Sequence, residues 1–313
     1  MISMSGCEKN KEEKIVVGIG WSNTQDSYSF ISTLKAVEEA GGIPLVLEMV
    51  RSDDLEYDAE GKLQNCTNGN GMLDMKASDL IKENGYRHSN IEKVMEGIDC
   101  LILPGGVDMS SYLYKEPEES HTIEDDLNYC AERDVSDYLL AQYCLDKDIP
   151  LLAICRGMQV LCIVSGAKMI QDIGTWFKEK GIEYHYQHRS ALKDEFVPHE
   201  ITIIDKDSLL YKLMKKDEVK GCPSWHHQAV ESLEGTDLSV TAYTNTEGID
   251  MIEAVERKDR SFVIGVQCHP EVAVRKHIDN EANANDYMTY DDALILFKTL
   301  IEKVKLKKAD EFK

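Results

Sequence analysis

The sequence lacks several features that would assign a protein to a broad functional class. No apolar run approaches the roughly 20 residues that a membrane-spanning helix needs. Asp and Glu number 57 against 35 Lys and Arg, so that the formal net charge is −22. Binding to phosphate backbones needs clustered positive charge, and the cationic cluster at residues 303–308 closes the last expected helix, where it suits the helix dipole. The composition therefore argues against a membrane protein and against a nucleic-acid-binding protein.

Motifs for cofactors and metals are also missing. There is no Walker-type phosphate loop, and Gly18-Ile19-Gly20 is too short for a dinucleotide-binding fingerprint. The nine cysteines are scattered without Cys-x-x-Cys pairs. His185 and His188 flank two residues, but no clustered carboxylate or cysteine has ligand spacing with them, and we interpret them as loop histidines. We therefore expect no cofactor and no metal.

The amino-terminal segment gives a prediction of cellular location. Residues 1–13 form a polar tail that lacks the apolar core of a signal peptide. An odd number of cysteines in a chain without an export signal is typical of reduced thiols. The sequence therefore predicts a cytoplasmic protein.

The apolar pattern along the chain predicts an α/β fold. Two apolar runs, 15–19 and 43–47, flank an amphipathic segment, 27–40, and this βαβ order predicts a parallel sheet. Further strands are expected at 100–103, 151–154, 199–204, 238–243, 251–256 and 262–267, and helices at 77–83, 124–144 and 291–305. Some of the later strands should pair antiparallel. The order fits a flavodoxin-like three-layer α/β/α sandwich with a mostly parallel central sheet plus a small antiparallel section.

The most informative segment surrounds Cys155. A short apolar strand, 151–154, is followed by this cysteine, by Gly157 and by an apolar run at helical spacing. This is the arrangement of a nucleophile elbow, which exposes the sulfur at the carboxyl edge of a sheet. The amino end of the following helix favours thiolate over thiol. Cys155 is therefore the candidate nucleophile, although a lone cysteine after a strand is more often a core residue.

A candidate base follows 114 residues later. The apolar strand at 262–267 precedes Cys268-His269-Pro270-Glu271, in which His269 can act as the base for Cys155 and Glu271 can orient it. A lone His-Pro-Glu is more often a turn, and Glu271 could simply be a helix-start acid. Both motifs nevertheless end predicted buried strands, where open α/β sheets place their active sites.

Backbone N–H groups are the natural donors for an oxyanion in such a site. The elbow offers the N–H of Arg156, and Pro104-Gly105-Gly106, at the end of another strand, offers that of Gly106. The alternative for the glycine pair is an ordinary turn. The side chain of Arg156 suits either a substrate carboxylate or a nearby acid.

Four segments together resemble one family: residues 104–108, 154–159, 226–230 and 265–271. They are similar to signatures of the class I glutamine amidotransferase-like superfamily, in its free-standing gamma-glutamyl-gamma-aminobutyrate hydrolase branch. The resemblance runs from about residue 14 to about residue 303. It implies a single domain of the class I glutamine amidotransferase type over residues 14–305, a probable insertion at 51–90 and a carboxyl-terminal tail at 306–313.

The resemblance also implies binding residues. Gln159 and Gly105 would help hold the glutamyl head group, and the loop with His226 and His227 would line the gamma-glutamyl pocket. We favour His227 as the one that faces the site, the alternative being an ordinary loop histidine. A homodimer is possible by resemblance alone. Ser165-Gly166-Ala167-Lys168 departs from the paired glycines, and Cys268 from the aromatic residue, that relatives carry.

The implied activity is that of a cysteine hydrolase. It would cleave the gamma-glutamyl amide bond of a small metabolite such as gamma-glutamyl-gamma-aminobutyrate, through a thioester on Cys155, and release glutamate. This chemistry belongs to polyamine (putrescine) catabolism. Two alternatives remain open: a glutaminase subunit that supplies ammonia to a separate synthetase, and a non-catalytic protein that binds a gamma-glutamyl ligand.

Overall fold

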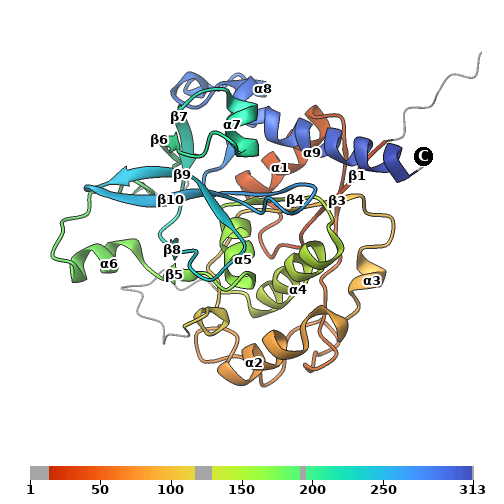
Figure 1. Cartoon of the computed structure of the whole chain (residues 1–313). Coiled ribbons are helices and arrows are strands. Elements are labelled where there is room, and N and C mark those ends of the chain that lie inside the picture. Colours follow the sequence, from red (N-terminus) through yellow and green to blue (C-terminus); the bar gives the residue numbers. More distant parts are fainter. Residues whose placement is uncertain (1–13, 117–128, 191–194, 312–313) are drawn as a thin grey trace, which may run out of the picture.

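The computed structural model describes residues 14–116, 129–190 and 195–311, and a mixed nine-stranded sheet forms its centre (Figure 1). The strand order is β2-β1-β3-β4-β11-β10-β9-β6-β7, and a separate two-stranded sheet pairs β5 with β8. The strands are β1 (Val16–Ile19), β2 (Ile43–Val46), β3 (Cys100–Leu103), β4 (Leu151–Ile154), β5 (Lys168–Ile170), β6 (Val197–Ile203), β7 (Glu218–Ser224), β8 (Ala229–Ser232), β9 (Ser239–Thr246), β10 (Ile249–Glu256) and β11 (Val263–Val266).

The sheet has a parallel half and an antiparallel half. β2, β1, β3, β4 and β11 pair in parallel, in the 2-1-3-4-5 order of flavodoxin-like folds. From β11 onward, β10, β9, β6 and β7 pair antiparallel. The predicted fold class, a mostly parallel central sheet with an antiparallel section, is confirmed.

Helices cover both faces of the parallel half. The helices of the described ranges are α1 (Tyr28–Glu39), α2 (Met75–Asn84), α3 (Ile91–Val94), α4 (Ala131–Lys147), α5 (Arg156–Val164), α6 (Ile173–Glu179), α7 (Leu209–Met214), α8 (Pro270–Ile278) and α9 (Tyr290–Glu311), with 3-10 turns η1 (Gly85–Arg87), η2 (Ser111–Leu113) and η3 (Ala284–Asp286). In Figure 1, α1, α8 and α9 lie on one side of the strands, and α4 and α5 lie on the other.

The layers follow from the two-residue period of the strands. In β3, Leu101 and Leu103 belong to the apolar core under α4 and α5, whereas Cys100 and Ile102 belong to the core under α1, α8 and α9. All four side chains are fully buried. Strands that are buried on both faces read as continuous apolar runs, which is why the sequence predicts them well.

The later part of the chain departs from the sequence-based expectations. β5, β7, β8, α6, α7 and α8 were not among the expected elements. β7 contains Gly221 and Pro223, which disfavour strands, and it is held by its pairing with β6. The helix expected at 124–144 begins at Ala131 in the structure, and residues 117–128 lie outside the described part of the chain.

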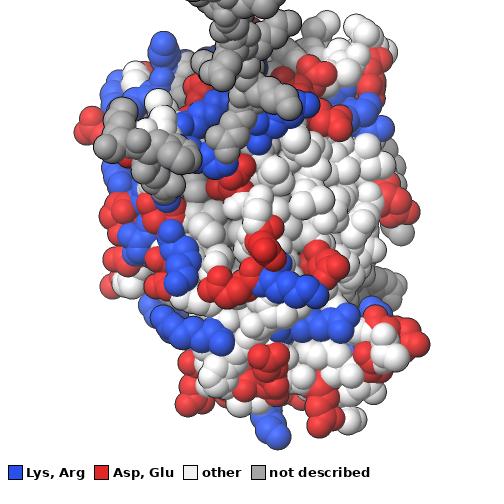
Figure 2. All heavy atoms as spheres, turned by 90° about the vertical axis from the view of Figure 1, so that its right-hand side faces the viewer, with Lys and Arg blue, Asp and Glu red and all other residues white. Residues whose placement is uncertain are grey.

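The surface carries charges of both signs. Figure 2 shows the face on the right of Figure 1, where Lys and Arg side chains are interspersed with Asp and Glu around an uncharged area. None of the helices within the described ranges is long and apolar enough to cross a membrane.

Candidate active site

Cys155 lies at a sharp turn between β4 and α5. Its backbone has φ 50° and ψ −107°, a conformation that non-glycine residues adopt rarely and that is typical of strained functional sites. The turn is held by its neighbours, since the Cys155 N–H donates to the Val266 carbonyl oxygen at 2.7 Å. The residue is 4% exposed. The strand–turn–helix geometry expected of a nucleophile elbow is therefore present.

Gly157 allows α5 to start directly above the neighbouring strand. A Cβ atom at this position would lie 2.1 Å from the carbonyl oxygen of Leu103, at the end of β3. Because this obstacle is backbone in a central strand, only glycine fits here without a shift of the helix. Gly157 therefore fixes the distance between the Cys155 turn and the end of β3.

His269 reaches the same edge of the sheet through strand pairing. β11 pairs in parallel with β4, so that Val266 is opposite Ile154, and the chain then continues to His269 at the start of α8. The Nδ1 atom of His269 lies 2.6 Å from Oε1 of Glu271. A carboxylate only accepts, so Nδ1 carries the proton of this hydrogen bond. The other ring nitrogen, Nε2, is buried and has no hydrogen-bond partner within the described ranges.

The electrostatics of His269 favour its charged form. Burial lowers its pKa, but the nearby Cys155 and the Glu271 carboxylate outweigh this effect and raise the pKa to about 10. The structure therefore brings together Cys155, His269 and Glu271, and it favours the charged form of His269.

Two residues that sequence analysis missed support this group. Ser29, on α1, donates to Oε1 of Glu271 at 2.8 Å and lies 3.3 Å from Nδ1 of His269. Phe196 packs edge-on against the His269 ring, with the centroids 5.0 Å apart. No local signal identifies either residue, because their partners are 242 and 73 positions away in the sequence.

The glycine loop after β3 is oriented by Arg133. The guanidinium Nη2 donates to the carbonyl oxygens of Pro104 at 3.1 Å and Gly105 at 2.8 Å. In a trans peptide the N–H points opposite to the C=O, so the N–H groups of Gly105 and Gly106 point away from Arg133. Gly105 faces His269, because a Cβ atom on it would lie 2.6 Å from Cε1 of that ring. Arg133 was also missed by the sequence analysis.

Arg156 has separate roles for its backbone and its side chain. As the first residue of α5, it has an N–H without an intrahelical partner. Its guanidinium, 1% exposed, binds Asp134 at 2.7 Å and also Asp137. Of the two alternatives for this side chain, the structure shows the pairing with nearby acids.

Arg156, Asp134, Asp137 and Arg133 form one buried network of ion pairs. Burial and the neighbouring Arg156 lower the pKa of Arg133 to about 10, which leaves it charged at neutral pH. The network therefore holds the glycine loop through Arg133 and the elbow through Arg156.

Gln159, on α5, contacts the loop that carries His226 and His227. The Gln159 Nε2 atom donates to the Gln228 carbonyl oxygen at 3.0 Å, and the side chain is 4% exposed. His227 lies between Asp108, at 3.0 Å, and Asp172, at 3.1 Å. Burial lowers the pKa of His227, but hydrogen bonds with these two carboxylates raise it to about 10.

His226 is bonded in a different direction. Its Nδ1 atom donates to the Gln228 carbonyl oxygen at 2.9 Å, and its Nε2 atom lies 3.2 Å from Nδ1 of His188. It is 5% exposed. His227, in contrast, is joined through Asp108 to the segment that follows Gly106, which keeps it the preferred candidate for contact with a ligand.

Several known proteins are similar to this chain. Protein NtpR of Enterococcus hirae is 34% identical over 197 residues, which is 63% of this chain and 74% of that protein. The gamma-glutamyl-gamma-aminobutyrate hydrolase of Escherichia coli O157:H7 is 26% identical over 184 residues, 58% of this chain and 68% of the hydrolase.

The fold is shared with solved structures at low sequence identity. The glutaminase domain of Trypanosoma brucei CTPS, with bound acivicin, superimposes with a TM-score of 0.52 and 17% identity over 94% of each chain. This likeness concerns the fold alone.

The family model for peptidase C26 matches residues 80–271, which is more than half of the chain. The chain therefore belongs to the peptidase C26 family, a glutamine amidotransferase-like family of hydrolases.

Proposed function

We propose that this protein is a cysteine hydrolase that cleaves the gamma-glutamyl amide bond of a small metabolite and releases glutamate. The observation that carries the proposal is the group formed by Cys155, at a strained elbow, and His269, which is hydrogen-bonded to Glu271 at 2.6 Å. Membership of peptidase C26 and the similarity to the E. coli hydrolase support the reaction class.

In the first half of the proposed reaction, the Cys155 sulfur attacks the gamma-carbonyl carbon of the substrate. The oxyanion that forms accepts hydrogen bonds from the N–H groups of Gly106 and Arg156, which are fixed in advance by the buried network behind them. His269 then donates the proton on Nε2 to the leaving amine, and a thioester on Cys155 remains.

In the second half, water replaces the amine. His269 accepts a proton from the water through Nε2, and the hydroxide attacks the thioester carbonyl. The carbon–sulfur bond breaks, glutamate leaves, and the thiolate–imidazolium pair is restored. Glu271 holds the ring by its Nδ1–H throughout and stabilises the imidazolium. The proposed binding residues are Gln159, Gly105 and His227, with His226 next to His227 in the loop after β7.

Gamma-glutamyl-gamma-aminobutyrate is the proposed substrate, which would place the enzyme in polyamine (putrescine) breakdown within the cytoplasm. The test measures glutamate release from a panel that holds this compound, other gamma-glutamyl amines and glutamine. Cys155→Ala should lower the rate of glutamate release by more than about 10³-fold. Cys162→Ala, which removes a fully buried thiol from the same helix, is the matched control and should retain release.

The outcomes separate the alternatives. Release from one gamma-glutamyl amine that depends on Cys155 supports the proposal. Release from glutamine alone points to a glutaminase subunit, and tight binding without turnover points to a ligand-binding protein. Full release by Cys155→Ala would exclude a thioester mechanism.

A further inference from the structure

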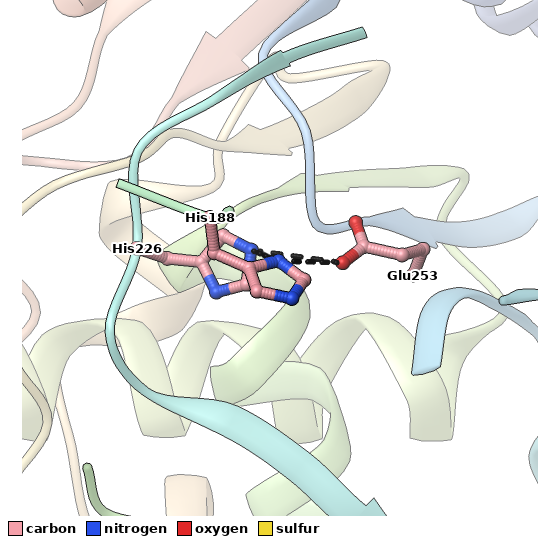
Figure 3. Close-up of side chains that lie close together, drawn as sticks. All are labelled: His188, His226 and Glu253. Carbon is pink, nitrogen blue, oxygen red and sulfur yellow. Dashed lines mark hydrogen bonds and ion pairs between the residues drawn. The ribbon is translucent and has the colours of Figure 1, made fainter. Parts of the chain in front are cut away.

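Next to the candidate active site, three buried side chains direct their polar atoms at one point. His188 precedes β6, His226 follows β7, and Glu253 belongs to β10. They are 0%, 5% and 1% exposed. Figure 3 shows the Glu253 carboxylate directed at the ring nitrogens of the two histidines. His188 and Glu253 have no part in the proposed hydrolysis, and the Nε2 atom of His226 is directed at His188.

The distances among the three atoms match one face of a metal-coordination tetrahedron. His188 Nδ1 lies 3.2 Å from His226 Nε2 and 3.3 Å from Glu253 Oε1, and His226 Nε2 lies 3.7 Å from Glu253 Oε1. Ligands bound to Zn²⁺ at about 2.0–2.2 Å in a tetrahedron are separated by about 3.3–3.6 Å. Charge-assisted hydrogen bonds, in contrast, are about 2.7–2.9 Å long. The two distances to the Glu253 carboxylate are therefore closer to those of a metal site, whereas the His188–His226 distance also suits a neutral hydrogen bond.

A hydrogen-bonded cluster would leave Glu253 poorly satisfied. Both of its carboxylate oxygens are buried and lack a hydrogen bond of acceptable geometry within the described ranges. Its ion-pair partners there are all histidines: His188, His226 and His199, the last at 3.5 Å from Oε2. Burial of a carboxylate costs several kcal/mol, and ion pairs without hydrogen-bond geometry offset this cost only in part. A divalent cation at the point where the three atoms meet would remove this cost.

The outer nitrogens of the two rings are also bonded as in metal sites. His226 Nδ1 must donate to the Gln228 carbonyl oxygen, which leaves the Nε2 lone pair of the neutral ring directed at the cluster. His188 Nε2 lies 2.7 Å from Thr246 Oγ1. In the tautomer in which Nε2 donates to this hydroxyl oxygen, the lone pair of Nδ1 is also directed at the cluster. Metal-ligating histidines typically donate their other N–H in this way.

We propose that His188, His226 and Glu253 form a Zn²⁺ site with three protein ligands and a fourth position for water. Two imidazoles and one carboxylate suit Zn²⁺ better than Mg²⁺ or Ca²⁺, which prefer oxygen ligands. The ion would tie the segment before β6 and the loop after β7 to the antiparallel half of the sheet. Gln228, two residues after His226, contacts Gln159, so the ion would also stabilise the loop that borders the candidate active site.

Metal content tests the site independently of hydrolysis. The full-length protein, in a Cys155→Ala background that removes the reactive thiol as a competing ligand, is dialysed against Zn²⁺ and then against metal-free buffer. We expect one Zn²⁺ per chain by elemental analysis. Glu253→Gln and His188→Gln should reduce this content at least tenfold. The matched control, His185→Gln, removes an exposed histidine three residues from His188 and should retain the ion.

Co²⁺ provides a second measurement that does not depend on these variants. Co²⁺ added to the chelator-treated Cys155→Ala protein should give the visible absorption of a four-coordinate N/O site and raise the melting temperature. If Glu253→Gln fails to fold, this titration still decides the question. Equal Zn²⁺ content in the parent and Glu253→Gln, or no spectral and thermal response to Co²⁺, would overturn the proposal and leave a hydrogen-bonded histidine cluster.

Discussion

The contact beneath Gly157 allows a quantitative test of the elbow. In Gly157→Ala, the new Cβ atom would lie 2.1 Å from the Leu103 carbonyl oxygen, whereas real contacts of this kind stay above 3.0 Å. The start of α5 must therefore move from β3 by about 0.9 Å. β3 is a central, fully buried strand and cannot give way.

The expected cost follows from overpacking. Forced insertion of a methyl group into a packed region costs typically about 1–3 kcal/mol. Displacement of reacting groups by about 1 Å can cost on the order of 10²-fold in rate. We therefore expect the free energy of unfolding to fall by about 1–3 kcal/mol, and Cys155-dependent glutamate release to fall on the order of 10²-fold.

The assay compares denaturant unfolding and glutamate release of Gly157→Ala with those of Gly174→Ala. Gly174 is likewise the second residue of its helix, α6, but a Cβ atom there makes only an ordinary contact, 3.4 Å from Asp172 Oδ1. The control variant should be neutral or gain up to about 1 kcal/mol from better helix propensity. Equal stability of the two variants would refute the close approach of α5 to β3.

Three further predictions concern the charged groups. Glu271→Gln removes one of the groups that raise the pKa of His269 and should lower turnover about 10³–10⁴-fold, with a changed pH–rate profile; an unaltered profile would contradict the role of the carboxylate. The charge on His227, whose pKa is raised to about 10, contributes stability that is complete below pH about 6.5 and is lost as the pH rises toward 10. Asp108→Asn should reduce this alkaline loss in thermal melts recorded from pH 6 to 10, and an identical slope would argue against the ion pair. Ser29→Ala removes one hydrogen bond to a carboxylate and should cost about 1.5–3 kcal/mol of unfolding free energy, whereas a change below 0.5 kcal/mol would mean that water replaces the hydroxyl.

Sequence predicted the parts of the fold in which pattern and burial coincide. The apolar runs Cys100–Leu103 and Leu151–Ile154 were expected with the bounds that the structure has. β5 and β8 were missed because both are short. Each is a strand only through its antiparallel pairing with the other, and the two segments are far apart in the sequence. Local propensity carries no information about such a partner.

The same division applies to the site. The elbow and the His-Pro-Glu motif are local and were found, whereas Ser29 and Arg133 act through contacts that only the fold creates. The sequence analysis grouped no carboxylate with His188, because Glu253 is 65 positions away in the sequence. The pairing of β10 with β9, together with the loop after β7, brings that carboxylate to the histidines.

The position of β4 between β3 and β11 has a consequence for biosynthesis. β3 is available as soon as β4 emerges from the ribosome, but β11 follows more than a hundred residues later. Until then, β4 presents an unpaired apolar edge, which favours wrong associations. A chain interrupted before β11 carries Cys155 without His269. Premature termination anywhere in the intervening segment should thus yield aggregation-prone fragments in which the candidate active site is incomplete. The site can assemble only after β11, His269 and Glu271 have been made.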